Sequence, residues 1–298
     1  LAGAEAAPQG PPIRLIQPST PQGDKWDAEN RAPIFERMLR LTGAPAAGPP
    51  PALIVWPEVA VTFLFDESPK AIARAAEAAG GSALAVGAVR MDPEGRLYNS
   101  LHFHGPDGAP LGTYDKRRLA PFGEYVPYAW LLRRIGLNTL GEGLSGFTPG
   151  DRAAPFVLPD LAPVAPLICY EVIFPALVGE AAQGAGWILQ VTNDAWFGDS
   201  AGPWQHLAQA RARAIEQGLP VARAANTGVS AFIDRYGRLT AILPLGARGA
   251  LDSPLPGGPV PTPYARLGDA PWLALAAILA AFLRLRRDAP TSASCRID

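Results

Sequence analysis

The sequence predicts a layered α/β protein, because short apolar runs typical of buried strands alternate with longer segments of helical periodicity. This alternation occurs on both sides of a region rich in Gly, Pro and aromatic residues at 114–149. A chain of 298 residues with 48% hydrophobic residues is also long enough to bury a large core. These observations favour a folded α/β domain over a peptide or a disordered chain.

The composition excludes several classes of protein. Lys and Arg total 26 and Asp and Glu total 27, so a net charge of -1 creates no general attraction for nucleic acid. Two cysteines, Cys169 and Cys295, are too few for a disulfide framework or a structural zinc site. Glycine (31) and proline (33) are abundant, which predicts a fold rich in loops.

The first half predicts two helices among four strands. A helix is expected at 27–41, where apolar residues recur at helical spacing, and another at 69–80, which begins with proline and ends at Gly-Gly. An Asp-Pro-Glu-Gly turn joins the last two strands into a hairpin. The expected strands are 13–17, 53–56, 83–90 and 97–104.

The second half continues the same pattern after the segment 114–149, which has weak periodicity and is expected to be a functional or disordered loop. The expected elements, in order, are a strand at 164–169, a helix at 172–183, a strand at 187–192, a helix at 204–217 and strands at 221–224 and 229–234.

A Pro-rich linker at 254–263 precedes an uncharged apolar run at 270–283, which three arginines follow. We expect a transmembrane helix at 270–285, with a cytoplasmic tail at 286–298 by the positive-inside rule and the rest of the chain outside. A helix buried in the core or lying at a membrane interface is the alternative. The chain begins with Leu1 and its start lacks the pattern of a signal peptide, so we expect a piece of a longer protein.

Three residues at predicted strand ends or in loops could carry chemistry. Cys169 ends an apolar strand just before a helix, where a nucleophile is presented and helix N–H groups can stabilise an oxyanion. Glu58 and Lys116 could supply a general base and a cation if all three side chains converge at one end of a sheet. Taken singly, the alternatives are a buried structural cysteine, a surface glutamate and a solvated basic turn.

The histidines give weaker signals. His102 and His104 alternate with Leu101 and Phe103 on a predicted strand, which indicates a role on a sheet face rather than a metal pair. His206 and these two lie apart from the segments that carry the three candidate residues. We expect no metal or redox cofactor, since nothing in the sequence has metal-ligand spacing.

Three segments together resemble the nitrilase (carbon–nitrogen hydrolase) superfamily: Leu-Ile-Val-Trp-Pro-Glu58, the segment 114–127 around Lys116, and Leu-Ile-Cys169-Tyr-Glu. Within that superfamily, the segments 192–198 and 202–206 are similar to the bacterial apolipoprotein N-acyltransferase family. Further likenesses lie at Lys25-Trp26 and in the segments 98–100, 225–228 and 262–266.

The resemblance implies a nitrilase-like αββα sandwich with Glu58 as base, Cys169 as nucleophile and Lys116 as the cation that stabilises the oxyanion. It also implies supporting or substrate-binding residues: Trp26 on a loop over the site, Asn99 in a Tyr-Asn-Ser motif, the Tyr170 backbone N–H at the oxyanion, and the carboxylates Glu124 and Glu171. Cys295 matches no motif and is interpreted as an incidental thiol of the tail.

The resemblance further implies a ping-pong transfer of an acyl chain from a phospholipid, through a cysteine thioester, to the α-amine of a lipoprotein whose N-terminal cysteine carries diacylglycerol. This is the last step of bacterial lipoprotein maturation, at the inner membrane with the catalytic domain on the periplasmic side. No nucleic acid partner is implied. Members of the family carry a bundle of membrane helices upstream, which this chain lacks.

The predicted organisation is a linker at 1–12, a catalytic domain at 13–253, a linker at 254–269, a membrane helix at 270–285 and a tail at 286–298. Two alternatives stay open. A soluble amidase of the same superfamily is favoured if the run 270–283 packs into the core. A non-catalytic, membrane-tethered binding domain is favoured if Glu58, Lys116 and Cys169 lie far apart.

Overall fold

The computed structural model describes residues 9–46, 48–127, 146–152 and 154–288, and it builds them into two β-sheets. One sheet has six strands in the order β11-β1-β2-β3-β4-β5, and the other has five in the order β10-β9-β8-β7-β6. The first consists of β1 (Pro12–Gln17), β2 (Leu53–Trp56), β3 (Ala83–Met91), β4 (Leu97–His104), β5 (Pro110–Asp115) and β11 (Gly249–Pro254). The second consists of β6 (Val164–Ile168), β7 (Trp187–Thr192), β8 (Val221–Ala225), β9 (Ser230–Ile233) and β10 (Leu239–Leu243).

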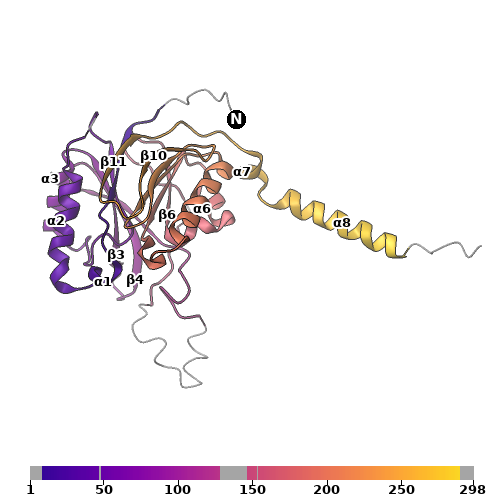
Figure 1. Cartoon of the computed structure of the whole chain (residues 1–298), viewed down its shortest axis with the longest axis horizontal. Helices are drawn as coiled ribbons and strands as arrows, with labels where there is room; N and C mark the ends of the chain where they lie inside the picture. Colours follow the sequence, from indigo (N-terminus) through magenta and orange to yellow (C-terminus); the bar gives the residue numbers. More distant parts are fainter. Residues whose placement is uncertain (1–8, 47, 128–145, 153, 289–298) are drawn as a thin grey trace, which may run out of the picture.

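Helices cover the outer face of each sheet (Figure 1). On the first sheet lie α2 (Arg31–Thr42) and α3 (Pro69–Ala79); on the second lie α5 (Pro175–Ala181) and α6 (Gly202–Gln217). Shorter elements are α1 (Gln22–Lys25), η1 (Ala28–Asn30), η3 (Cys169–Ile173), η4 (Asp194–Phe197) and α7 (Pro263–Leu267). The predicted α/β class and the αββα layering are therefore confirmed.

Alternation along the strands builds three apolar layers. On β2, Leu53 and Val55 join the core between the sheets, whereas Ile54 and Trp56 pack beneath α2 and α3. On β6, Val164 and Ile168 face the other sheet, and Ala165 and Leu167 pack against α5 and α6. Successive side chains of a strand point to opposite faces, so strands covered on both sides read as continuous apolar runs.

Strand direction brings the candidate residues to one edge of the sandwich. The strands β1, β2 and β3 run parallel, and β5 runs in the same direction because two antiparallel pairings separate it from β3. In the second sheet β6, β7 and β8 are also parallel. Glu58 follows β2, Lys116 follows β5 and Cys169 follows β6, so each leaves its sheet at the carboxyl end of a strand.

The predicted helix at 172–183 is wrong in its first part. Cys169–Ile173 form a 3₁₀ turn, Phe174 is extended with φ −100° and ψ 101°, and the α-helix begins at Pro175. The residue before a proline is disfavoured in helical conformation, whereas proline itself suits the first helical turn. The helix expected at 27–41 likewise begins as a 3₁₀ turn, and its α-helical part starts at Arg31.

Three strands were not predicted: β5, β10 and β11. All three lie at sheet edges and are partly exposed, so their sequences lack a buried apolar run. The pairing of β11 with β1 joins residues more than 200 positions apart, which no local pattern indicates.

The C-terminal apolar run forms the helix α8 (Ala270–Asp288), which projects away from both sheets (Figure 1). Every side chain from 270 to 284 is exposed, including Trp272 at 68% and Ile278 at 65%. The alternative that this run packs into the core is therefore not supported. Among the described helices, none combines the length and the apolar character that crossing a bilayer requires.

The turn that carries Glu58 packs directly against β3 at Gly87. A Cβ at position 87 would come within 2.1 Å of the Pro57 carbonyl oxygen and 2.9 Å of the Glu58 Cα, both backbone atoms. We predict that Gly87→Ala lowers the free energy of unfolding by about 1–3 kcal/mol, the usual cost of overpacking. Thermal unfolding measures the change, with Gly48→Ala as control because a Cβ there meets nothing within 4 Å. Equal stability of the two variants would contradict this packing.

Candidate active site

Glu58 lies buried at the edge of the first sheet and its carboxylate accepts three hydrogen bonds. Oε1 accepts from the Asn99 amide at 2.7 Å and from Lys116 Nζ at 3.1 Å, and Oε2 accepts from the Asn193 backbone N–H at 2.7 Å. Burial alone would raise the pKa of Glu58, but the charge of Lys116 and these hydrogen bonds outweigh it and hold the pKa below its usual range. The carboxylate is therefore ionised at neutral pH.

Lys116 is 1% exposed and lies between two carboxylates. Its Nζ is 3.1 Å from Glu58 Oε1 and 3.0 Å from Glu124 Oε1. Asn99 donates to both of these oxygens, and Glu124 Oε2 accepts from the Ala120 backbone N–H at 2.8 Å. Burial opposes the charge on Lys116, but the nearby anions outweigh it, so the pKa of Lys116 lies above its ordinary value.

Cys169 occupies the corner between β6 and the 3₁₀ turn, with a left-handed φ of 50°. Such a conformation is uncommon for a residue other than glycine and is often found at functional sites. Burial of the thiol, followed by the negative charge of Glu58, raises the pKa of Cys169 to about 12, although Lys116 acts in the opposite direction. The resting group is thus a neutral thiol near an ionised carboxylate and an ammonium group.

Glu171 holds this corner to the segment that follows Lys116. The carboxylate is fully buried and accepts from the backbone N–H groups of Ile168 at 2.7 Å and Arg117 at 2.6 Å. The Tyr114 hydroxyl donates to it at 2.9 Å. Burial raises the pKa of Glu171, yet all these partners are donors, as a carboxylate requires. Glu171 therefore ties the end of β6 to the end of β5.

Trp26 and Tyr170, the remaining predicted residues, are only partly buried. Trp26 directly follows α1 and is 51% exposed, and Tyr170 is half-buried with its ring edge against Phe174.

Lys25 was not predicted as a site residue, but its Nζ is buried and donates to the Glu58 backbone carbonyl at 3.3 Å. Burial lowers the pKa of Lys25 to about 8. The Lys25-Trp26 motif was the signal that could have indicated it.

The expectation that all three histidines lie apart from the site is wrong for His206. Its Nε2 is 3.0 Å from the carbonyl oxygen of Cys169, across 37 positions of sequence. His102 and His104 are buried on β4, where their Nδ1 atoms contact Thr113 Oγ1 and the Gly108 carbonyl, respectively. Cys295 lies outside the described residues.

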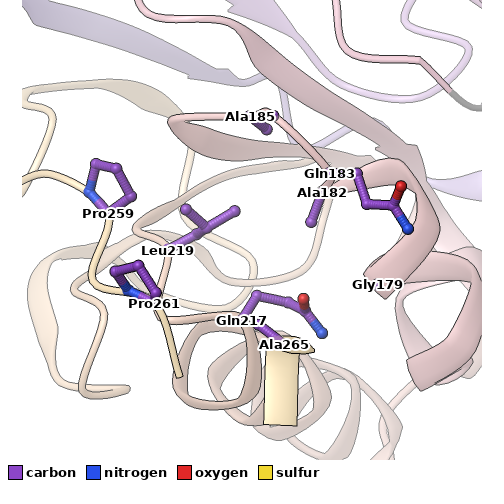
Figure 2. Close-up of a pocket in the computed structure, with 10 residues that line it drawn as sticks. Gly179, Ala182, Gln183, Ala185, Gln217, Leu219, Pro259, Pro261 and Ala265 are labelled. Atoms are coloured by element: carbon purple, nitrogen blue, oxygen red, sulfur yellow. The ribbon is translucent and has the colours of Figure 1, made fainter. Parts of the chain in front are cut away.

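No group of three His, Cys, Asp or Glu side chains in the described part of the chain is arranged to hold a metal ion. A hollow of about 230 Å³ does exist elsewhere, between α5, the end of α6 and the segment that contains Pro259 and Pro261 (Figure 2). Gln183, Gln217 and Leu219 help to line it, and none of the candidate catalytic residues does. This hollow is therefore separate from the site around Cys169.

The fold is that of α/β sandwich proteins of the nitrilase type. A Saccharomyces cerevisiae protein described as Nit3, a member of branch 10 of the nitrilase superfamily, matches with a TM-score of 0.63 at 17% identity, covering 99% of this chain and 100% of that one. An amidase from Nesterenkonia sp. AN1 matches with a TM-score of 0.61 at 21% identity, covering 91% and 99%. That structure shows covalent addition of an acetamide moiety at its active site cysteine.

The chain belongs to the carbon–nitrogen hydrolase family, whose model matches residues 13–255. It is also 44% identical over 292 residues to the apolipoprotein N-acyltransferase of Rhodopseudomonas palustris, and 46% identical over 252 residues to that of Brucella melitensis. These matches cover 94% and 82% of this chain but only 54% and 47% of the relatives. The predicted resemblance is confirmed, and the chain spans about half the length of these relatives.

The charges around Cys169 predict how its thiol titrates. In a Cys295→Ser background, the rate of alkylation by iodoacetamide should keep rising about tenfold per pH unit up to pH 10, because only the thiolate reacts. Glu58→Gln should lower the apparent pKa, since it removes a negative charge and leaves Lys116 in place, whereas Lys116→Met should raise it. A wild-type plateau below pH 9, or shifts of the opposite sign, would contradict this electrostatic arrangement.

Proposed function

We propose that this chain carries the catalytic domain of an apolipoprotein N-acyltransferase, with Glu58, Lys116 and Cys169 as catalytic residues. The observation that carries the proposal is the convergence of a buried carboxylate, a buried ammonium group and a cysteine at the carboxyl ends of strands from both sheets. Cysteine, a general base and a fixed cation are the groups that acyl transfer through a thioester needs.

In the first half-reaction, the Cys169 thiol gives its proton to Glu58 while Sγ attacks an ester carbonyl of a phospholipid. The oxyanion of the tetrahedral intermediate is stabilised by Lys116 and by the Tyr170 backbone N–H. When the intermediate collapses, the ester C–O bond breaks and Glu58 returns the proton to the departing lyso-phospholipid oxygen. An acyl thioester remains on Cys169.

In the second half-reaction, the α-amine of the acceptor lipoprotein attacks the thioester carbonyl and gives a proton to Glu58. The C–S bond breaks, an amide forms, and the proton passes to the sulfur of Cys169. Asn99 and the Asn193 N–H hold the Glu58 carboxylate in place through both steps, and Glu124 supplies the second counter-charge for Lys116. Glu171 keeps the Cys169 corner in register with the Lys116 segment.

Exposed aromatic side chains beside the site support a lipid substrate. Each stands within four positions in sequence of Lys25, Glu124 or Asn193, which contact Glu58 or Lys116. Exposed apolar groups gathered at one place often mark a binding site. Those beside this site are Trp26 at 51%, Phe122 at 68%, Tyr125 at 38%, Trp196 at 65% and Phe197 at 42% exposed. Apolar rings around a charged centre suit a donor and an acceptor that both carry acyl chains.

The two alternative functions have less support. A soluble amidase was favoured only if the apolar run 270–283 packed into the core, and those side chains are exposed. A binding domain without catalysis was favoured only if the three candidate residues lay apart, but Lys116 bonds Glu58, and the charges of both act on the Cys169 thiol.

We further propose that α8 anchors the domain in the bacterial inner membrane, with the active site on the periplasmic side. Its uncharged run, 270–283, extends about 21 Å at 1.5 Å per residue, which is shorter than the ~30 Å of a bilayer core. The sequence continues with Arg284, Arg286 and Arg287, and a basic cluster after an apolar run favours the cytoplasmic side and lengthens the reach of a short run to the headgroups.

The acyl-enzyme is the direct test of the catalytic assignment. Incubated with phospholipid in detergent micelles, the chain should gain the mass of one acyl chain, removable by hydroxylamine. Cys169→Ala should abolish this adduct and Glu58→Gln should slow its formation by at least about 100-fold, the lower end for losing a general base. Cys295→Ser is the matched control and should acylate normally. An adduct that persists in Cys169→Ala would overturn the assignment.

Flotation with phospholipid vesicles tests the anchor. The double variant Leu275→Glu with Ile278→Glu should reduce the vesicle-bound fraction at least tenfold, since a charge at the centre of an inserted helix costs about 2.5–3.5 kcal/mol. Both side chains are exposed, so the domain should unfold at an unchanged temperature. Val157→Glu, which replaces a 77% exposed apolar residue outside α8, should bind like the original chain. Equal binding of all three would exclude α8 as the anchor.

A further inference from the structure

Three buried charged or titratable groups lie behind the proposed nucleophile, and the mechanism above does not use them. Asp194 begins the 3₁₀ turn after β7, His206 lies on α6, and Arg223 lies on β8. Their exposed fractions are 1%, 5% and 0%. Charged groups are rarely buried to this degree unless they are paired and hydrogen-bonded.

The His206 ring connects this group to the backbone of Cys169. Nδ1 is 2.8 Å from Asp194 Oδ1, and Nε2 is 3.0 Å from the Cys169 carbonyl oxygen. A carbonyl oxygen can only accept a hydrogen bond, so its 3.0 Å contact with the ring is attractive when Nε2 carries the hydrogen. The ring then joins the Asp194 carboxylate to the Cys169 backbone.

Further polar groups surround the ring and Asp194. Arg223 also bonds Asp194, at 2.6 Å, and lies 3.4 Å from His206 Nδ1. The Thr192 hydroxyl donates to Asp194 at 2.9 Å. Gln190 Nε2 lies 3.4 Å from the Cys169 carbonyl and 3.3 Å from His206 Nε2. Only a proton on Nε2 makes its 3.0 Å approach to the carbonyl attractive.

We propose that His206 is a positioning residue for the nucleophile: a buried ring, fixed by Asp194, whose Nε2–H holds the Cys169 carbonyl and so maintains the left-handed conformation of Cys169. The inference rests on the proposed function only in calling Cys169 the nucleophile. The φ of 50° turns the Cys169 peptide away from the line of β6, and the ring on α6 holds the carbonyl in that orientation.

The hydrogen on Nε2 can be observed without any enzyme assay. In protein labelled with ¹⁵N at histidine, Nε2 of His206 should show a directly bonded hydrogen in the folded protein, and His206→Gln assigns its signals among the three histidines. A His206 Nε2 without a hydrogen would overturn the proposal, because it could not donate to the Cys169 carbonyl.

Two variants separate positioning from stability. The amide of His206→Gln can reach the place of Nε2 and donate to the Cys169 carbonyl, whereas that of His206→Asn reaches only the place of Nδ1. In a Cys295→Ser background, His206→Asn should slow alkylation of Cys169 by about 2–10-fold, the range expected for the loss of one hydrogen bond. His206→Gln should recover most of that loss, because it keeps a donor at the place of Nε2.

The control is His104→Gln, which replaces another buried histidine, on β4, with no contact to Cys169. It should alkylate at the original rate. Equal rates in both His206 variants, or losses that follow their thermal unfolding temperatures, would reduce His206 to a structural residue and contradict the proposal. If the ring and the alkylation behave as expected but no acyl-enzyme forms from phospholipid, the proposed function fails while this inference stands.

Discussion

The buried ion cluster of Glu58, Lys116 and Glu124 is the constraint on which the rest of the site depends. Two carboxylates flank one ammonium group at about 3 Å, and Asn99 bonds both anions. Taking these charges out of water is costly, so each must be paired and hydrogen-bonded. The cluster therefore fixes the ends of β2 and β5 and the loop that carries Glu124 relative to one another. It also sets the charges that the Cys169 thiol meets.

The second sheet contributes Cys169 and the groups that hold it in place. Cys169 follows β6 in a left-handed conformation. The Glu171 carboxylate accepts hydrogen bonds from the backbone of both sheets' strand ends, at Ile168 and at Arg117. The Asn193 N–H, after β7, donates to Glu58. The Cys169 thiol has a raised pKa and meets the charges of Glu58 and Lys116. The sandwich thus brings a carboxylate and an ammonium group from one sheet near a thiol from the other.

Much of this arrangement was predictable from sequence, because local patterns report strand ends. The strands before Glu58 and Cys169 are continuous apolar runs, and both residues follow them directly. The contacts of His206 with Cys169 and of Lys25 with Glu58 were missed, since each joins residues more than 30 positions apart. The helix start near residue 172 was wrong because Pro175 and the Cys169 corner override helical periodicity. Edge strands such as β10 were not predicted, because their partly exposed residues do not form the continuous apolar run of a buried strand.

A double-mutant cycle between Glu58 and Lys116 tests the central claim most directly. The free energy of unfolding would be measured for the original chain, Glu58→Gln, Lys116→Met and the double variant. If the pair organises the site, each single change removes the attraction between the two residues, and the double variant loses that attraction only once. The double variant should therefore be more stable than the sum of the single losses predicts, by about 0.5–3 kcal/mol. Losses that simply add would show that the two residues are neighbours without energetic coupling, and would contradict the account.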